Sequence, residues 1–432
     1  MIYNDSKYNA DWEIKPLSKL GEFRRGKSKH RPRNDKKLFI NGNYPLVQTG
    51  EISAANLFIR HHSAMYNEFG LKQSKLWDTN TLCITIAANI AETALLGYSM
   101  CFPDSIVGFN AYPDECSELF MHYVFTYIKR SIQNSASGSI QDNINIDYLT
   151  SLNFRIPKKK YQDKVVEVLT ALDNKIEINT LINSELEAMS KSVYDYWFVQ
   201  FDFPDENGQP YKTSGGKMFW NKELKREIPD GWAVKRLVDF GEFKNGINYD
   251  PSLPGDTEAK IINVRNISST NLFVSQYALD TISLAKENVK NYLVTENDIL
   301  IARSGIPGAT RMMFEFAENT IYCGFIIRFQ VYSPTVKNYL FYFLKDMEAS
   351  TTSKSGGTIM SNVNQETLKS MWVVEPKEDL YLKFNTFISP FFKQANTITK
   401  ETEKLYVLRD WLLPMLMNGQ VKLNEKAAKG KS

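Results

Sequence analysis

The amino-acid sequence predicts an α+β fold: two repeated mixed α/β domains joined by two long antiparallel coiled-coil helices, with a pseudo-twofold relation between the halves. Two observations support this prediction. The sequence repeats itself once over most of its length, and each copy is followed by a long stretch with apolar residues at heptad spacing. Self-similarity at a long period indicates two copies of one structural unit.

Two blocks of sequence carry the repeat. Residues 12–26 contain Gly-Glu-Phe and return as residues 232–246, an offset of 220 positions (232 − 12). Residues 138–145 read Gly-Ser-Ile-x2-Asn-Ile-Asn and return, with Thr and Val as the changes, as residues 357–364, an offset of 219 (357 − 138). Two copies in one chain suit a partner with two related sites, such as duplex DNA.

The composition is that of an ordinary globular protein. At 432 residues with 43% apolar content, the chain is expected to hold two or more domains. No apolar run reaches the about 18 residues that a membrane span needs, and the N-terminus lacks an apolar signal core, so we expect a cytoplasmic protein. The four cysteines are scattered, which favours buried free thiols over disulfides or a metal site.

The chain is expected to divide into six segments. Residues 1–158 form the first mixed domain, 159–200 a central spacer helix, 201–231 a turn-rich linker, 232–377 the second domain, 378–420 a C-terminal spacer helix and 421–432 a basic tail. Residues 119–132 are predicted to be helical. Short runs between turn signals predict strands at 44–48, 81–86, 153–156, 260–264, 298–302 and 325–331.

Both spacer helices show two rows of seam positions at heptad spacing, as a coiled coil requires. In the central helix the rows are Val165, Leu172, Asn179, Leu186, Val193 and Val168, Lys175, Ile182, Met189, Tyr196. In the C-terminal helix they are Phe384, Phe391, Ile398, Leu405, Leu412 and Phe387, Gln394, Glu401, Leu408, Met415. The alternative is that each helix merely packs on its own domain. We expect Asn179 to fix the register, and Pro390 and Pro414 to kink or break the second helix.

A dense basic run follows the first Gly-Glu-Phe block. Pro32 and Asn34 keep it non-helical, which favours a loop that contacts phosphates over an ordinary solvated surface. The net charge of the whole chain is only +3, so global charge does not indicate nucleic-acid binding, whereas this local run is opposed only by Asp35. Its basic residues are Arg24, Arg25, Lys27, Lys29, Arg31, Arg33, Lys36 and Lys37.

Catalytic motifs are missing from the sequence. It contains no Pro-Pro of the type used by amino-methyltransferases, and no glycine-rich loop with the spacing of a nucleotide site. Asp205, Glu223 and Lys225 have the order of a Pro-Asp…Glu-x-Lys nuclease, but such residues are common and here fall in the polar linker. The chain is therefore interpreted as a binder that lends specificity to other subunits.

Three sets of residues together resemble one known family. They are Ile228-Pro-Asp-Gly-Trp-x2-Lys-x-Leu237, the segment from Tyr196 to Gly208, and the paired Gly-Ser/Thr-Ile-x2-Asn-Ile/Val-Asn blocks. In this order, over essentially the whole length, they resemble the DNA specificity (S) subunit of type I restriction–modification systems.

The resemblance implies that each domain is a target recognition domain for one half of a bipartite, asymmetric DNA sequence, with the helices as a ruler between them. It implies two modification subunits, which supply S-adenosylmethionine and adenine N6 methylation, and two motor-nuclease subunits that use ATP and Mg²⁺. No cofactor is expected on this chain itself. Four residues inserted near Asn179 are expected to lengthen the spacer between the half-sites.

Candidate base-reading residues follow strands in both domains. In the first domain Gln48 suits adenine, Glu51 accepts from cytosine and Thr49 lies between them. In the second domain the candidates are Asn263, Arg265, Asn266, Arg303 and Ser304, and Lys244 is a further DNA-binding candidate. Arg suits guanine and Asn suits adenine. Two other functions stay open: a self-sufficient restriction endonuclease built on Glu223, and a coiled-coil adaptor that binds DNA without sequence preference.

Overall fold

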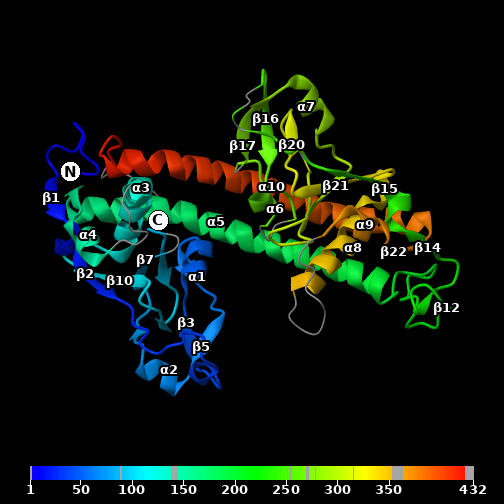
Figure 1. Cartoon of the computed structure of the whole chain (residues 1–432), viewed down its shortest axis with the longest axis horizontal. Coiled ribbons are helices and arrows are strands. Elements are labelled where there is room, and N and C mark those ends of the chain that lie inside the picture. Colours follow the sequence, from blue (N-terminus) through cyan, green and yellow to red (C-terminus); the bar gives the residue numbers. More distant parts are fainter. Residues whose placement is uncertain are drawn as a thin grey trace, which may run out of the picture. The chain divides into compact units, whose positions relative to one another are not determined.

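The computed structural model describes residues 2–87, 90–137, 145–250, 252, 255–268, 272–277, 279–314, 316–352 and 363–423. The chain forms two compact units. Unit 1 comprises residues 1–177 and 405–432, and unit 2 comprises residues 178–404 (Figure 1). Among the described residues, no helix combines the length and apolarity that crossing a membrane would take.

Unit 1 is built on a five-stranded sheet with the order β2-β10-β7-β8-β4. Its strands are Gly21–Arg25, Ile106–Ala111, Leu82–Thr85, Thr93–Leu96 and Phe58–Ile59. Helix α3 (Glu118–Ser137) packs on this sheet. A second sheet has the order β5 (Ala64–Tyr66), β3 (Tyr44–Leu46), β9 (Met100–Cys101) and β6 (Leu76–Trp77). A separate pair joins β1 (Glu13–Pro16) to β11 (Asn153–Ile156), and short helices are α1 (Thr49–Ala54), α2 (Glu68–Lys72) and α4 (Ile146–Ser151).

Unit 2 repeats this plan. Its main sheet has the order β15 (Gly241–Asn245), β21 (Ile326–Val331), β18 (Asp298–Ala302) and β19 (Thr310–Met312), with α8 (Pro334–Thr352) packed on it. A second sheet has the order β17 (Asp280–Leu284), β16 (Thr257–Ile262) and β20 (Thr320–Tyr322). The separate pair is β14 (Ala233–Arg236) with β22 (Trp372–Glu375), and short helices are α6 (Val264–Ile267), α7 (Lys286–Asn291) and α9 (Gln365–Lys369).

The repeated topology confirms the predicted duplication. The strand pair β1–β11 corresponds to β14–β22, and the order β2-β10-β7 corresponds to β15-β21-β18. Even the caps match: Asn145 accepts from Tyr148 N at 2.7 Å to start α4, and Asn364 accepts from Thr367 N at 2.8 Å to start α9. Most of the second repeated block, residues 138–144 and 357–362, lies outside the described residues.

The segment predicted as a linker contains regular structure. Strands β12 (Met218–Asn221) and β13 (Arg226–Pro229) pair antiparallel. Phe203 stacks on Tyr211 with ring centroids 4.7 Å apart, and on Trp232 at 5.1 Å. The many turn-forming residues of segment 201–231 therefore do not mean that the segment lacks strands.

The two long helices, α5 (Lys159–Tyr194) and α10 (Glu378–Met417), pair antiparallel. In unit 2, Asn179 Nδ2 donates to Glu401 Oε2 at 2.8 Å and to Thr402 Oγ1 at 3.1 Å. One turn further along α5, Asn183 Nδ2 donates to Thr399 Oγ1 at 3.1 Å. The partners on α10 thus move toward its N-terminus as α5 advances. These contacts agree with the expectation that a buried asparagine fixes the register.

The predicted seam is right in one row and wrong in the other. The row from Val165 to Val193 is buried or half-buried, but Lys175, Ile182, Met189 and Tyr196 are exposed. The buried or half-buried second row lies one residue later, at Leu169, Ile176, Asn183, Ser190 and Trp197, and on the C-terminal helix at Ile388, Ala395, Thr402, Arg409 and Leu416. Apolar content misled the assignment because polar residues occupy several buried positions of both helices.

Of the expected kink or break in α10, the break is wrong, because the helix is continuous through Pro390 and Pro414. A proline removes one backbone hydrogen bond. Tertiary packing offsets that loss here: Ile388 and Phe392, on either side of Pro390, are 0% and 4% exposed.

Each end of the helix pair belongs to a domain core. In unit 1, Leu413 and Leu416 of α10 join Val165 and Leu169 of α5 in the cluster that covers the main sheet. In unit 2, Phe384 and Phe392 join Tyr194 in a cluster with β18 and β21. Helix pairing and domain packing, posed as alternatives, therefore occur together. The four cysteines are free and buried, as predicted.

Candidate nucleic-acid interface

Both units present the same loop-bearing edge of the main sheet. It forms where β2 and β7 end and β10 begins, and in unit 2 where β15 and β18 end and β21 begins. In unit 1, Ile86 N donates to Ser105 O at 3.0 Å; in unit 2, Arg303 N donates to Phe325 O at 2.9 Å. We call these the loop edges: residues 26–34, 86–87 and 103–105 in unit 1, and 246–249, 303–308 and 323–325 in unit 2.

The predicted phosphate-contacting side chains lie exposed on or beside the loop edge of unit 1. These are Arg24, Arg25, Lys27, Lys29, Arg31 and Arg33. Asp104, which sequence reasoning missed, gathers several of them. Its carboxylate lies 2.6 Å from Arg33 Nη2 and 3.6 Å from Arg31 Nη2, and its carbonyl accepts from Arg25 Nε. The cluster keeps guanidinium groups close together at the surface, an arrangement suited to a polyanion.

A hollow of about 470 Å³ adjoins this cluster. Arg33, Gln48, Thr49 and Ser105 line it, although they come from distant parts of the sequence. The structure therefore brings Gln48 and Thr49, the candidate base readers, next to the basic loop.

Glu51, a candidate base reader, is engaged in hydrogen bonds at the start of α1. Its carboxylate accepts from Gln48 N at 3.0 Å and from Ser63 N at 3.2 Å, and it also accepts from the Ser63 hydroxyl. Burial acts to raise its pKa, but these hydrogen bonds outweigh burial and the pKa is lowered. Glu51 thus holds the start of α1 and orients Gln48 and Thr49.

Two segments that carry candidates of unit 2 meet at Gly305. This glycine has φ of +80°, and a Cβ there would lie 2.9 Å from Val264 Cγ1. The loop that carries Arg303 and Ser304 consequently packs against the start of α6, next to Arg265. Because Gly305 adopts a left-handed conformation, any other residue would be strained there.

The remaining candidates of unit 2 differ in their surroundings. Arg265 and Asn263 both bind Asp280, and the Arg265 side chain is 62% exposed. Asn266 is buried, and its Oδ1 accepts from Asn263 N at 2.8 Å as a helix cap. Lys244 donates to Asn291 O at 2.7 Å, and its ammonium lies over the ring of Tyr292.

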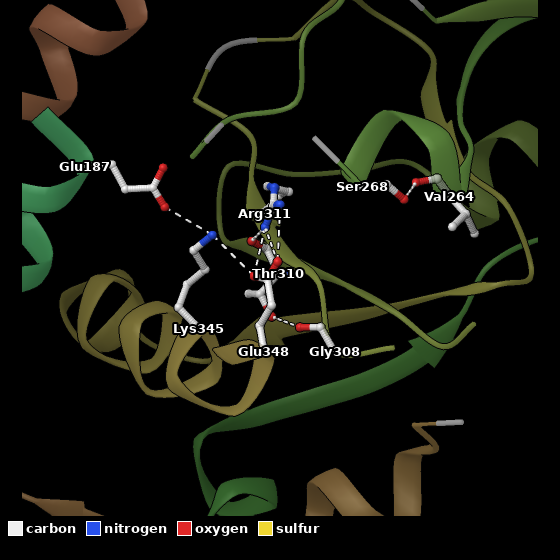
Figure 2. A network of polar contacts seen from close by, with 8 residues as sticks. All are labelled: Glu187, Val264, Ser268, Gly308, Thr310, Arg311, Lys345 and Glu348. Carbon is white, nitrogen blue, oxygen red and sulfur yellow. Dashed lines mark hydrogen bonds and ion pairs between the residues drawn. The ribbon is translucent and has the colours of Figure 1, made fainter. Parts of the chain in front are cut away.

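A polar network adjoins the end of the loop 303–308 at Gly308 (Figure 2). Arg311 on β19 is 2% exposed, and its guanidinium lies 3.0 Å from Glu348 Oε2 on α8. Lys345 binds both Glu348, at 3.2 Å, and Glu187 of α5, at 3.1 Å. Thr310 Oγ1 donates to Gly308 O at 2.8 Å, which ties the end of the loop to this network.

The nuclease-like residues of the linker show no assembled site. Asp205 Oδ1 accepts from the backbone of Asn207 and Gln209, each at 2.8 Å, and so closes a turn. Glu223 and Lys225 are exposed. Within the part of the chain that the structure describes, no group of three or more His, Cys, Asp or Glu side chains is placed to hold a metal ion.

Comparisons with known proteins identify the family of this chain. A family described as Type I restriction modification DNA specificity domain matches residues 9–188 and 229–405. The chain is 23% identical to the type I restriction enzyme MjaIX specificity subunit of Methanocaldococcus jannaschii, covering 97% of this chain and 95% of that protein. It is 24% identical to the HindI specificity subunit of Haemophilus influenzae, covering 68% and 74%.

A solved structure shares the fold. The S subunit of a type I restriction–modification system from M. genitalium aligns with a TM-score of 0.51 at 16% identity, covering 98% of this chain and 100% of that one. The two matched family segments coincide with the two copies of the repeat.

Proposed function

We propose that this chain, which belongs to the type I restriction modification DNA specificity family, reads a bipartite, asymmetric DNA sequence with one domain on each half-site. In this proposal the chain has no catalytic activity of its own. It directs adenine N6 methylation and restriction, which partner subunits carry out.

The observation that carries the proposal is the pair of loop edges. They are equivalent in backbone hydrogen bonding, yet their side chains differ. Unit 1 offers a guanidinium cluster beside Gln48 and Thr49, whereas unit 2 offers Arg303 and Ser304. Equivalent scaffolds with unlike side chains are what two different half-sites require, because hydrogen bonds to base edges specify sequence.

The paired helices are proposed to set the distance between the half-sites and to carry the partner subunits. Two modification subunits with S-adenosylmethionine, and two motor-nuclease subunits with ATP and Mg²⁺, would complete the complex. Exposed apolar side chains on α5 and α10 support a docking role. In unit 2 a hollow of about 1000 Å³ is lined by Tyr196, Trp197, Leu382 and Phe387.

A DNA-binding measurement tests the proposal. The chain in complex with its modification subunit should bind its target about 10³-fold or more tightly than random DNA at one stated salt concentration. Equal binding to both would favour a non-specific adaptor. If the purified chain alone cleaved DNA, and Glu223→Ala abolished the cleavage, the endonuclease alternative would replace the proposal.

A further inference from the structure

Phe325 is a large apolar side chain held in solvent at the loop edge of unit 2. It is 61% exposed, although its neighbours Gly324 and Ile326 are buried. Sequence reasoning assigned it only to the start of a strand. Single exposed apolar residues are common on protein surfaces, so its meaning depends on its position.

The backbone around Phe325 is firmly held. Its carbonyl accepts from Arg303 N at 2.9 Å, and Ile326 N donates to Cys323 O at 2.9 Å in a tight turn. Gly324 N donates to Ile247 O at 2.8 Å, so the loop-edge segment 246–249 is also hydrogen-bonded to the turn. A Cβ on Gly324 would lie 1.9 Å from Asn248 Oδ1, which explains the glycine at this position. Because this backbone is already fixed, ordering it costs little when the ring binds.

Phe325 lies among polar and apolar groups of the loop edge that is proposed to read DNA. Arg303 Nη1 donates to Gly324 O at 3.3 Å, which places a guanidinium beside the turn. Ile306, 37% exposed, lies in the adjoining loop of the same edge. The equivalent position in unit 1 is Ser105, whose carbonyl accepts from Ile86 N in the same way. One repeat thus carries a hydroxyl where the other carries an exposed ring.

We infer that Phe325 is a specificity-determining residue of the second domain, which packs its ring against the methyl group of a thymine in the half-site that this domain reads. The inference rests on the proposed function. Among base-edge groups in the major groove, the thymine C5-methyl is the apolar one, and side chains such as Phe recognise it by contact. Such a contact would distinguish thymine from cytosine at that position, while Arg303 contributes a polar contact.

The test uses the full chain in complex with its modification subunits. Phe325→Ala should weaken binding to the target about tenfold, and change binding to random DNA less than twofold. Tyr332→Ala is the matched control, because Tyr332 is a 65% exposed aromatic residue just beyond the other end of β21. The control should leave both affinities unchanged.

Uracil in place of thymine, one position at a time, identifies the contact. One substitution should weaken the unaltered complex several-fold and have no effect on the Phe325→Ala complex, while Phe325→Leu should keep part of the sensitivity. An unchanged affinity in Phe325→Ala, or a loss that no uracil substitution reproduces, would overturn the inference. If the unaltered complex shows no two-part preference, the proposed function itself has failed.

Discussion

Replacing Arg311 should destabilise unit 2 far more than replacing an exposed arginine. Arg311 is 2% exposed, and Glu348, which it binds at 3.0 Å, is 17% exposed. Removing one partner of a buried pair costs about 3–5 kcal/mol, because the other charge stays buried. Lys345 lies 3.2 Å from Glu348 and compensates in part. We therefore expect Arg311→Met to cost about 2–3 kcal/mol at neutral pH.

The effect should depend on pH through Glu348. Burial acts to raise the pKa of Glu348, but the hydrogen bond and charge of Arg311 outweigh it, so the pKa lies below its usual 4.5. A lowered pKa in the folded state gives stability that is present above 4.5 and lost as the pH falls through the folded value. Without Arg311 this contribution disappears. The cost of Arg311→Met should therefore shrink between pH 7 and pH 4, and a further Glu348→Gln change should recover part of it.

Urea unfolding at both pH values, read from hydrogen exchange of the β18 and β19 amides, measures these costs. The control is Arg265→Met, because Arg265 and its partner Asp280 are 62% and 46% exposed. An exposed pair contributes about 0–1 kcal/mol. The reasoning is refuted if Arg311→Met costs no more than the control, or costs the same at both pH values.

Three further predictions test other parts of the account. Seven residues inserted after Thr180 in α5 and seven after Lys400 in α10 keep the heptad seam and add about 10 Å to each helix. The gap between the methylated half-sites should then grow by about three base pairs, with the half-sites unchanged. An unchanged gap would exclude the role of the helices as a ruler. Replacing Lys27 or Lys29 with Ala should weaken binding equally on all sequences and reduce the slope of log K against log salt by about one, whereas an unaltered slope would remove that residue from the phosphate contacts. His122 is buried, and burial, followed by the charge of Arg409, lowers its pKa from 6.5 to about 3. The neutral imidazole therefore contributes stability at pH values above 6.5, and about 2 kcal/mol of it is lost by pH 5. The His122→Gln variant should show a flatter dependence of stability on pH between pH 6.5 and pH 5.

The architecture was predictable because its signals are redundant. The duplication rests on two independent blocks, and several strands form where β-formers lie between turns. Asn153–Ile156 and Asp298–Ala302 have the bounds that the sequence predicts. The fold class is confirmed, since local pattern and long-range repeat point to the same structure.

What the sequence could not predict depends on tertiary contacts. The inner row of α5 contains the half-buried Asn183 and the buried Ser190, and their positions are recognisable only when the packing of α10 and of the core is known. The role of Asp104 depends on a chain reversal that brings it to Arg33, and that of Phe325 depends on three loops meeting. Single-sequence patterns carry no information on which exposed side chains gather at one edge.

Mapping methylated adenines in DNA from cells that co-express this chain with its modification subunit tests the central claim most directly. We expect one two-part motif with a fixed gap and unlike halves, because the two loop edges carry different side chains. Methylation without a motif, or no methylation although the complex forms, would contradict the account.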